Sequence, residues 1–397
     1  MKYPLLNDAF SPSDLNEGIR VIKSGKLTMS NKTLNFEKYF SKKIISKYSI
    51  MTNSGSSANL LSEAAACNPV RKNHLKPKDE VLIPAVCWST SLWPLLQYNL
   101  KPVFVDVDLH NLNMNINDMK KKITKKTKAI MCVHILGLST NMDEISKIKK
   151  KNNLVLFEDT CESLGSRFKN KNLGTFGDFG TFSFYYSHQI TSGEGGMIVC
   201  KTSEDYNLIK CLRSHGWSRN TTFHNKMKKK FKKIDERFLF VNSGYNLRPL
   251  DVTAAIAYNQ MKRLPQFISI RNYNRNILIK KIKTNVKWND QFEFIDPPKN
   301  FSPSWFGLPI LINNKLKHKK KKFLNFLNKV GIENRPIVSG NFLNQPAIKL
   351  YNIKTKGIFV NSQNIEDRGF FIGLHTKKIN KKISDYVTKN LLEIDKI

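Results

Sequence analysis

Residues 154–160 read LVLFEDT, and this stretch determines how the middle of the chain is expected to fold. Its four apolar residues have the length and composition of a buried strand, and the acidic pair Glu158 and Asp159 closes the run. Similar apolar runs recur on both sides, separated by amphipathic stretches such as residues 142–151, where isoleucines recur at helical spacing. The strand candidates are residues 80–83, 103–105, 129–133, 154–157, 181–184 and 197–200.

Strands that alternate with helices predict an α/β fold with a mainly parallel sheet covered on both faces. In such sheets ligands bind beyond the carboxyl ends of the strands, which is where Glu158 and Asp159 would lie. One of these carboxylates could pair with a pyridine nitrogen, keep it protonated and let the ring accept electrons. A helix N-cap aspartate explains the same fragment equally well when it is considered alone.

The chain has 397 residues, enough to bury a large core and to form two domains. After residues 264–265, Leu-Pro, the pattern changes to a long helical stretch at 266–283 and a proline-containing strand region at 305–312. We therefore expect a large domain of residues 1–263, whose N-terminal segment packs on the smaller one, and a small α+β domain of residues 264–397.

The formal net charge of +35 is unusually high, and lysines cluster at residues 120–128, 226–233, 317–322 and 377–382. Such clusters could bind nucleic acid. However, they are scattered along the chain and lack interleaved aromatic residues, so we interpret them as solvated faces and expect no nucleic-acid partner.

The first ten residues hold no signal-peptide core, and the longest apolar run, residues 129–138, is interrupted by His134 and too short to cross a bilayer. We expect a cytoplasmic protein with no membrane partner. The six cysteines show no CxxC pair and no metal-ligand spacing, which predicts reduced thiols and no metal site.

Two further fragments have the composition of ligand-binding turns. Residues 52–59, TNSGSSAN, lead into a predicted helix at 57–67, and a glycine-containing turn at a helix start can bind a phosphate. An ordinary N-cap is the alternative interpretation. Residues 180–188, GTFSFYYSH, end a strand in polar residues and His188, which considered alone is more often structural than catalytic.

The order of these fragments resembles the DegT/DnrJ/EryC1/StrS family, whose members are nucleotide-sugar aminotransferases that use pyridoxal phosphate. The similarity runs from about Leu27 to Met261, with further matches at residues 304–307 and at Arg335-Pro336. It implies the aspartate-aminotransferase fold (fold type I), with a mainly parallel seven-stranded sheet and a smaller α+β C-terminal domain. The motifs are NSGSSAN at 53–59, PAVCW at 84–88, ED at 158–159, GTFGD at 174–178, SFYYSH at 183–188, GEGG at 193–196 and GYNLR at 244–248.

The resemblance implies a set of residues that bind pyridoxal or pyridoxamine 5′-phosphate. Within it, Trp88 would stack on the pyridine ring, although plain core packing is the alternative for this side chain. Asn246 would reach the phosphate in a neighbouring subunit, which implies a homodimer with shared active sites. The implied cofactor-binding residues are Ser56, Ser57, Trp88, Asp159, Glu162, Ser183 and Asn246.

His188 is where the sequence departs from the family, because the aminotransferases carry a lysine at this position. No lysine occurs between Lys171 and Lys201, so a shifted alignment does not restore it. An imidazole cannot form a Schiff base, but it is a good general base and acid near neutral pH. We therefore expect His188 to be the catalytic residue and the cofactor to be bound non-covalently.

A histidine at this position resembles the sugar 3-dehydratases within the family. That likeness implies removal of the C3 hydroxyl of GDP-4-keto-6-deoxy-D-mannose to give a 4-keto-3,6-dideoxy sugar for O-antigen or lipopolysaccharide synthesis. Glutamate would be the amino donor, and 2-oxoglutarate and ammonia would be released. His215, Arg219 and Arg248 would contact the substrate, although structural bonds explain these residues equally well.

Three alternatives stay open. A nucleotide-sugar 4-aminotransferase is disfavoured by the missing lysine. A CDP-4-keto-6-deoxyglucose 3-dehydrase would need four thiolates for a two-iron two-sulfur cluster, and the segment after Cys211 lacks the clustered cysteines. From a different class, the chain could be a non-catalytic or nucleic-acid-binding basic protein.

Overall fold

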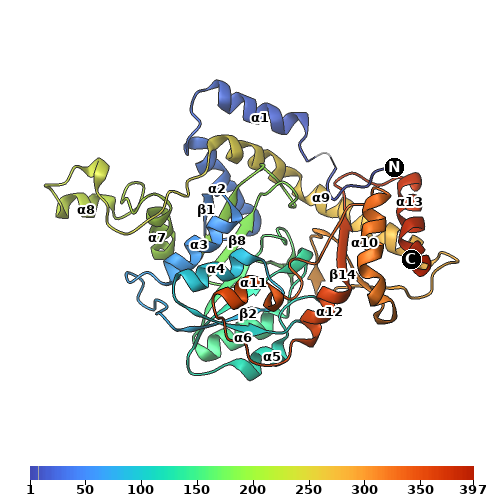
Figure 1. Cartoon of the computed structure of the whole chain (residues 1–397). Coiled ribbons are helices and arrows are strands. Elements are labelled where there is room, and N and C mark those ends of the chain that lie inside the picture. Colours follow the sequence, from blue (N-terminus) through green and yellow to red (C-terminus); the bar gives the residue numbers. More distant parts are fainter. Residues whose placement is uncertain (8) are drawn as a thin grey trace.

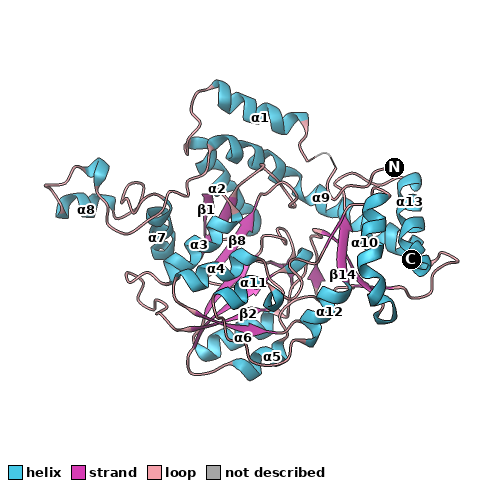
Figure 2. Ribbon diagram, viewed as in Figure 1, coloured by secondary structure: helices cyan, strands magenta, loops and turns pink. Residues whose placement is uncertain are grey.

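The computed structural model describes residues 1–7 and 9–397, and a seven-stranded sheet forms its centre (Figures 1 and 2). The strand order is β1-β9-β8-β5-β4-β2-β3. Only β9 runs antiparallel to its neighbours in this sheet, so the predicted mainly parallel sheet is confirmed. The strands are β1 Tyr48–Thr52, β2 Glu80–Pro84, β3 Lys101–Val105, β4 Thr127–Val133, β5 Val155–Asp159, β8 Phe179–Ser183 and β9 Gly196–Cys200.

Both faces of this sheet are buried. Successive side chains along a strand point to opposite faces, so neighbouring residues of one strand enter different buried clusters. On β1, Ile50 belongs to one buried cluster and Met51 to another; on β9, Ile198 and Met197 divide in the same way. Helices cover the two faces (Figure 2). They are α2 Asn31–Ile44, α3 Gly55–Ala66, α4 Ser89–Gln97, α5 Ile116–Lys122, α6 Met142–Asn152 and α7 Ser203–Arg213, and α8 His224–Lys230 projects away from the sheet in Figure 1.

The C-terminal part contains a four-stranded antiparallel sheet of order β10-β12-β14-β13, with helices packed beside it. A short strand from this part, β11 Phe301–Ser302, joins β6 Arg167–Phe168 and β7 Lys171–Asn172. The four strands are β10 Phe292–Phe294, β12 Gly307–Ile312, β13 Asn334–Arg335 and β14 Gly369–Gly373, and the helices are α10 Lys320–Lys329, α11 Pro346–Leu350, α12 Val360–Arg368 and α13 Lys381–Leu391.

A single long helix, α9 Asp251–Lys283, connects the two parts (Figure 1). The predicted start of a helix at residue 266 was wrong, because α9 continues through Pro265. Proline removes one hydrogen bond of the helix, but Met261 and Leu264, which precede it, are buried, and this packing favours the continued helix. The proposed division after residue 263 falls inside this helix.

The N-terminal residues lie along the small sheet. The Tyr3 N–H donates to the Gly331 carbonyl at 2.7 Å, and the Tyr3 hydroxyl donates to the Gly373 carbonyl at 2.8 Å. The chain then reaches α1 Pro12–Lys23, which packs along α9 (Figure 1). The chain therefore starts on one part of the molecule and crosses to the other before the main sheet begins.

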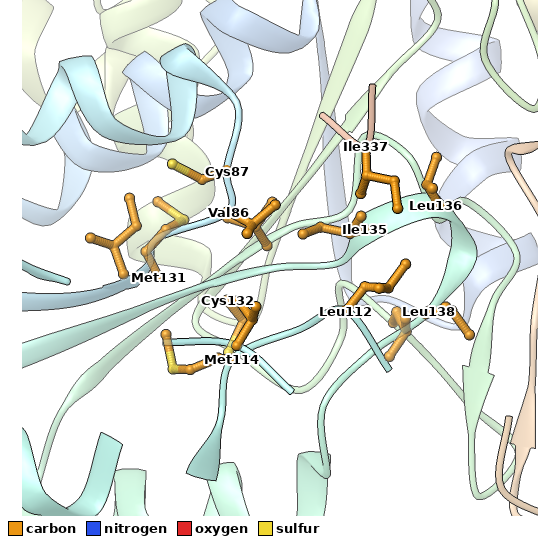
Figure 3. Packing of buried hydrophobic residues seen from close by; sticks show 14 of the residues in the cluster. Val86, Cys87, Leu112, Met114, Met131, Cys132, Ile135, Leu136, Leu138 and Ile337 are labelled. Carbon is orange, nitrogen blue, oxygen red and sulfur yellow. The ribbon is translucent and has the colours of Figure 1, made fainter. Parts of the chain in front are cut away.

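One buried cluster extends across both parts. Figure 3 shows Ile337, from the segment after β13, beside Ile135 and Leu136, which follow β4. Such packing fixes the strand ends of the main sheet against the small sheet. Among the described residues, no helix is long and apolar enough to cross a membrane, and no group of three or more His, Cys, Asp or Glu side chains could hold a metal ion.

A buried ion pair ties three elements of the main sheet together, and its loss should be costly. Arg213 on α7 donates to Glu37 Oε1 at 2.7 Å and to the Met51 carbonyl at 2.6 Å. Arg213→Met keeps the apolar stem but leaves the buried carboxylate of Glu37 with the Met51 N–H at 2.8 Å and without its positive partner, so we expect the free energy of unfolding in urea to fall by about 3–5 kcal/mol. Arg237→Met, which removes an exposed pair with Asp235, should change it little; equal losses would contradict this assignment.

Candidate active site

A cavity of about 860 Å³ opens at the carboxyl ends of the parallel strands. It lies between the main sheet and the small one, because Phe306, Arg335 and Phe371 from the C-terminal part also line it. Six residues predicted for the site are brought together in its wall: Ser56, Trp88, Asp159, Glu162, Ser183 and His188.

The start of α3 forms one end of the cavity. Ser54 is the N-cap, and its Oγ accepts a hydrogen bond from the Ser57 N–H at 3.0 Å. Ser57 therefore caps the helix with Ser54 and does not line the cavity, whereas Ser56 and Ser183 do. A helix start with two hydroxyl groups beside it offers donors and a favourable dipole to an anion.

Gly55 is needed for the close approach of α3 to β8. A Cβ atom at this position would lie 2.6 Å from Cβ and 2.9 Å from Oγ of Ser183. Any side chain here would push the helix start away from the strand end, and the two hydroxyl groups of Ser56 and Ser183 would separate.

Asp159 is the last residue of β5 and lies in the cavity wall with its carboxylate held in place. Oδ2 accepts hydrogen bonds from Asn59 Nδ2 at 2.8 Å and from Ser91 Oγ at 2.6 Å. Oδ1 accepts from the Cys161 N–H at 3.2 Å. These donors fix the orientation of a carboxylate that can pair with a protonated ring nitrogen.

Trp88 is the N-cap residue of α4 and is 56% exposed, on the cavity wall. A tryptophan so exposed at the edge of a cavity does not pack in the core, so the alternative interpretation of this residue was wrong. Its ring face is available to stack on a flat aromatic ligand.

His188 lies in the cavity wall, in the loop that follows β8. Its ring makes edge contacts with Tyr185 and Phe306, at centroid distances of 5.9 and 5.1 Å. Nδ1 is buried and has no hydrogen-bond partner among the described residues. Burial, and then the charge of Arg271, hold the pKa of His188 well below its usual value, so the imidazole is neutral and able to accept a proton.

Glu162 adds a second group that can change its charge in the site. Burial raises its pKa to about 7, the hydrogen bond from the Leu136 N–H at 2.9 Å opposes this, and the charge of Asp159 adds to it. A carboxyl group in this range can hold or release a proton at neutral pH.

The other four predicted residues lie together elsewhere. Asn246 accepts a hydrogen bond from Arg248 Nε at 3.0 Å, and the ring of His215 lies 4.8 Å from that of Trp217. The guanidinium groups of Arg219 and Arg248 lie 4.0 and 5.7 Å from the Trp217 ring. None of these residues lines the cavity of a single chain.

Several lining residues were not predicted. His134 directly follows the predicted strand at 129–133, so its position at a strand end was a signal that could have identified it. Most of the others lie in loops or in the C-terminal part, and apolar periodicity gives no signal for them. They include Leu5, Tyr185, Tyr186, Glu194, Glu333 and Arg335.

The residues present fit pyridoxal phosphate. The wall supplies an anion site at α3, a carboxylate for the ring nitrogen and an aromatic face. It also contains two histidines, His134 and His188, whose Nδ1 atoms have no hydrogen-bond partner among the described residues. No lysine is found among the described residues that line the cavity. The six cysteines are free, as expected, and Cys161 is the one among them that reaches this wall.

Comparison with known proteins identifies relatives along almost the whole chain. The model of the DegT/DnrJ/EryC1/StrS aminotransferase family matches residues 11–391. GDP-4-keto-6-deoxy-D-mannose 3-dehydratase of Escherichia coli O55:H7 is 39% identical over 394 residues, which cover 98% of this chain and 100% of the relative.

Solved structures agree. A structure of Escherichia coli GDP-4-keto-6-deoxy-D-mannose 3-dehydratase with bound hydrated PLP is 38% identical and superposes with a TM-score of 0.90, covering 98% of this chain and 99% of that one. A structure of GDP-4-keto-6-deoxymannose 3-dehydratase with a trapped PLP-glutamate geminal diamine has the same identity, 38%, and a TM-score of 0.90, covering 98% and 100%.

A methyl group at residue 55 should weaken cofactor binding. Gly55→Ala would separate the α3 start from Ser183, so we expect the dissociation constant for pyridoxal phosphate to rise about tenfold or more, equivalent to ~1.4 kcal/mol. Absorbance titration of the purified variant measures this. Gly18→Ala is the matched control, because the new Cβ meets only side-chain atoms there, of Ile256 at 3.1 Å and of Val252 at 3.7 Å. Unchanged affinity in Gly55→Ala would contradict the assignment of the phosphate site to the start of α3.

Proposed function

The chain belongs to the DegT/DnrJ/EryC1/StrS aminotransferase family, and within it we propose that it is a sugar 3-dehydratase. It removes the C3 hydroxyl of GDP-4-keto-6-deoxy-D-mannose to give the 4-keto-3,6-dideoxy sugar. The cofactor is pyridoxal phosphate, which glutamate converts to the pyridoxamine form, with release of 2-oxoglutarate and, after dehydration, of ammonia. The reaction belongs to deoxysugar synthesis for lipopolysaccharide O-antigens.

The observation that carries this proposal is an imidazole where aminotransferases of the family carry a lysine. His188 lies in the cavity wall, and no lysine side chain among the described residues lines that wall. A transaminase needs a primary amine to receive the cofactor after each half-reaction. Without it, the site can bind the cofactor and move protons, but it cannot exchange the cofactor between a protein amine and a substrate.

The side chains present suit an elimination. When bound, the cofactor supplies an electron-accepting ring joined to the keto carbon of the sugar. Asp159 keeps the ring nitrogen protonated, and Trp88 holds the ring plane. His188, neutral because of its burial, takes the proton from the C4′ carbon and can return it to the departing C3 hydroxyl, so that water leaves.

Four predicted site residues lie together away from the cavity of a single chain, which suggests that a second copy of the chain takes part in the site. We infer a homodimer in which Asn246, Arg219 and Arg248 of one protomer complete the cavity of its partner. Support comes from a stripe of exposed apolar side chains on α1, Leu15, Ile19 and Ile22, spaced for one helix face. Further exposed apolar residues lie in the projecting segment that carries α8: Phe231, Ile234, Phe238 and Phe240.

The alternatives find less support. An iron–sulfur enzyme needs clustered thiolates, and no group of three potential metal ligands occurs among the described residues. The lysine clusters lie on separate elements, on α5, on α8 and at the starts of α10 and α13. Figure 1 shows α8 and α10 on opposite sides of the molecule, so the four clusters do not form one continuous basic stripe of the kind that tracks a nucleic-acid backbone.

Product analysis tests the proposal directly. Purified protein with pyridoxal phosphate, glutamate and GDP-4-keto-6-deoxy-D-mannose should form a sugar lighter by one water and release ammonia. His188→Asn should lose at least about a hundredfold in rate, the usual contribution of a general base, while still binding cofactor. Mass spectrometry of the sugar and an ammonia assay measure both.

A 4-amino sugar that retains its C3 hydroxyl would identify an aminotransferase instead. A panel of GDP-, CDP-, UDP- and dTDP-linked 4-keto-6-deoxy sugars in the same assay determines the nucleotide. Turnover of the CDP sugar alone would contradict the substrate assignment.

Mixed dimers test whether the active site is shared. His188→Asn and Asn246→Asp chains should each be inactive alone, because one lacks the base and the other repels the cofactor phosphate. After unfolding and refolding together, activity should recover to about a quarter of wild type, since half of the dimers then carry one intact site. Mixing His188→Asn with Asp159→Asn should restore nothing, because both residues belong to one chain's cavity; equal recovery in both mixtures would contradict the shared site.

A further inference from the structure

The cavity wall carries a histidine that has no place in the reaction described so far. His134 follows the last residue of β4 and is 1% exposed. Its N–H donates to the Asp159 carbonyl at 2.9 Å, and its carbonyl accepts from Ser163 Oγ at 2.7 Å. The backbone of His134 is thus attached to β5 and to the turn after it, which fixes the position of the ring.

A buried carboxylate holds one ring nitrogen of His134. Nε2 lies 3.1 Å from Oε2 of Glu158, whose side chain is fully buried. Burial acts to raise the pKa of Glu158, but the hydrogen bond and charge of His134 and the N–H groups of Gly177 and Gly174, at 2.6 and 2.8 Å, hold it below its usual value. Glu158 is therefore ionised and accepts, so Nε2 carries a proton.

The other ring nitrogen has no partner. Nδ1 of His134 is buried and makes no hydrogen bond to any described residue. Buried polar atoms are nearly always paired in native proteins, and an unpaired one requires an explanation. Because His134 lines the cavity, a ligand bound there can supply the missing partner.

The strand order indicates which part of the cofactor lies nearest. Asp159 is on β5, which has β8 with Ser183 on one side and β4, followed by His134, on the other. In pyridoxal phosphate, the phosphate arm and the ring hydroxyl flank the reactive carbon on opposite edges of the ring. With the phosphate on the Ser183 side and the ring nitrogen at Asp159, the hydroxyl edge faces β4.

We propose that His134, held by Glu158, is a positioning residue that shares a proton with the ring hydroxyl of the cofactor through Nδ1. An imidazole nitrogen can donate or accept a hydrogen bond, so Nδ1 and the ring oxygen can form one with a single proton between them. The charged groups around it are Glu158 on one side, with Asp159 and Glu162 toward the cavity. This inference rests on the proposed cofactor, and it extends the proposed function by a second imidazole.

Glu158 holds the ring of His134 through Nε2, which leaves Nδ1 free for the ring oxygen of the cofactor. Removing Nδ1 should therefore change the pKa of the ring hydroxyl, which changes the absorption spectrum of the bound cofactor.

Two variants separate this role from a purely structural one. His134→Gln places an amide near the position of Nε2, which retains contact with Glu158 but removes Nδ1. His134→Asn places its amide near Nδ1 and gives up the contact with Glu158. Absorbance of bound pyridoxal phosphate is recorded against pH without any sugar, together with its dissociation constant.

We expect the spectroscopic midpoint of His134→Gln to move by about 1 pH unit or more and its cofactor affinity to fall about tenfold, whereas His134→Asn, which keeps a polar atom near the position of Nδ1, stays closer to wild type. The reverse order, with His134→Gln unchanged and His134→Asn disturbed, would show that the histidine only satisfies Glu158 and would overturn the proposal. Glu158→Gln, which keeps the side-chain shape, provides an independent variant and should move the midpoint in the same direction; an unmoved midpoint there counts against the proposal.

The result is separable from the dehydratase assignment. Wild-type protein that binds pyridoxal phosphate and shows the shift in His134→Gln, but does not dehydrate the sugar, would refute the proposed function alone. Wild-type protein that dehydrates the sugar while the midpoint stays the same in both His134→Gln and Glu158→Gln would refute this inference alone.

Discussion

The imidazole of a histidine cannot form a Schiff base with the aldehyde of the cofactor, as the amine of a lysine does. This constraint determines what the rest of the site must do. With His188 in the place of a lysine, the cofactor has to be held by contacts that are individually weak. We propose that they come from separate elements that line the cavity: the start of α3 for the phosphate, Asp159 for the ring nitrogen and Trp88 for the ring face. Each is fixed beforehand by the protein, which limits the entropy lost on binding.

The parallel sheet is what brings these contacts together. Neighbouring strands β8, β5 and β4 end at one edge, so the residues that end or follow them, Ser183, Asp159 and His134, form one wall. The small domain closes the opposite side, and its segment around Ile337 packs on the turn after β4 (Figure 3). In a chain with a formal net charge of +35, the lining of this cavity holds no lysine among the described residues. A lysine there would restore the amine that the chemistry has to avoid.

Much of this could be predicted from the sequence, and the exceptions have physical reasons. Apolar periodicity predicted the strands and the mainly parallel sheet, and the family resemblance predicted six of the side chains that meet in the cavity. Helix α9 was predicted to begin too late, because a local rule about proline ignores the packing on either side of Pro265. No local pattern encodes the tertiary contacts that bring Arg335 of the small domain to the cavity. The same holds for the pairing of His134 with Glu158. The predicted residues that lie near Trp217 are His215, Arg219, Asn246 and Arg248. Their role depends on a second chain and stays a prediction.

The central claim, that the cofactor is bound but never attached, has one direct test. Protein loaded with pyridoxal phosphate is reduced with borohydride, denatured, and its intact mass and peptide map are measured. We predict an unchanged mass, with all of the cofactor released into the small-molecule fraction. A mass increase equal to one reduced phosphopyridoxyl group, mapped to a lysine, would contradict the account and return the chain to the aminotransferases.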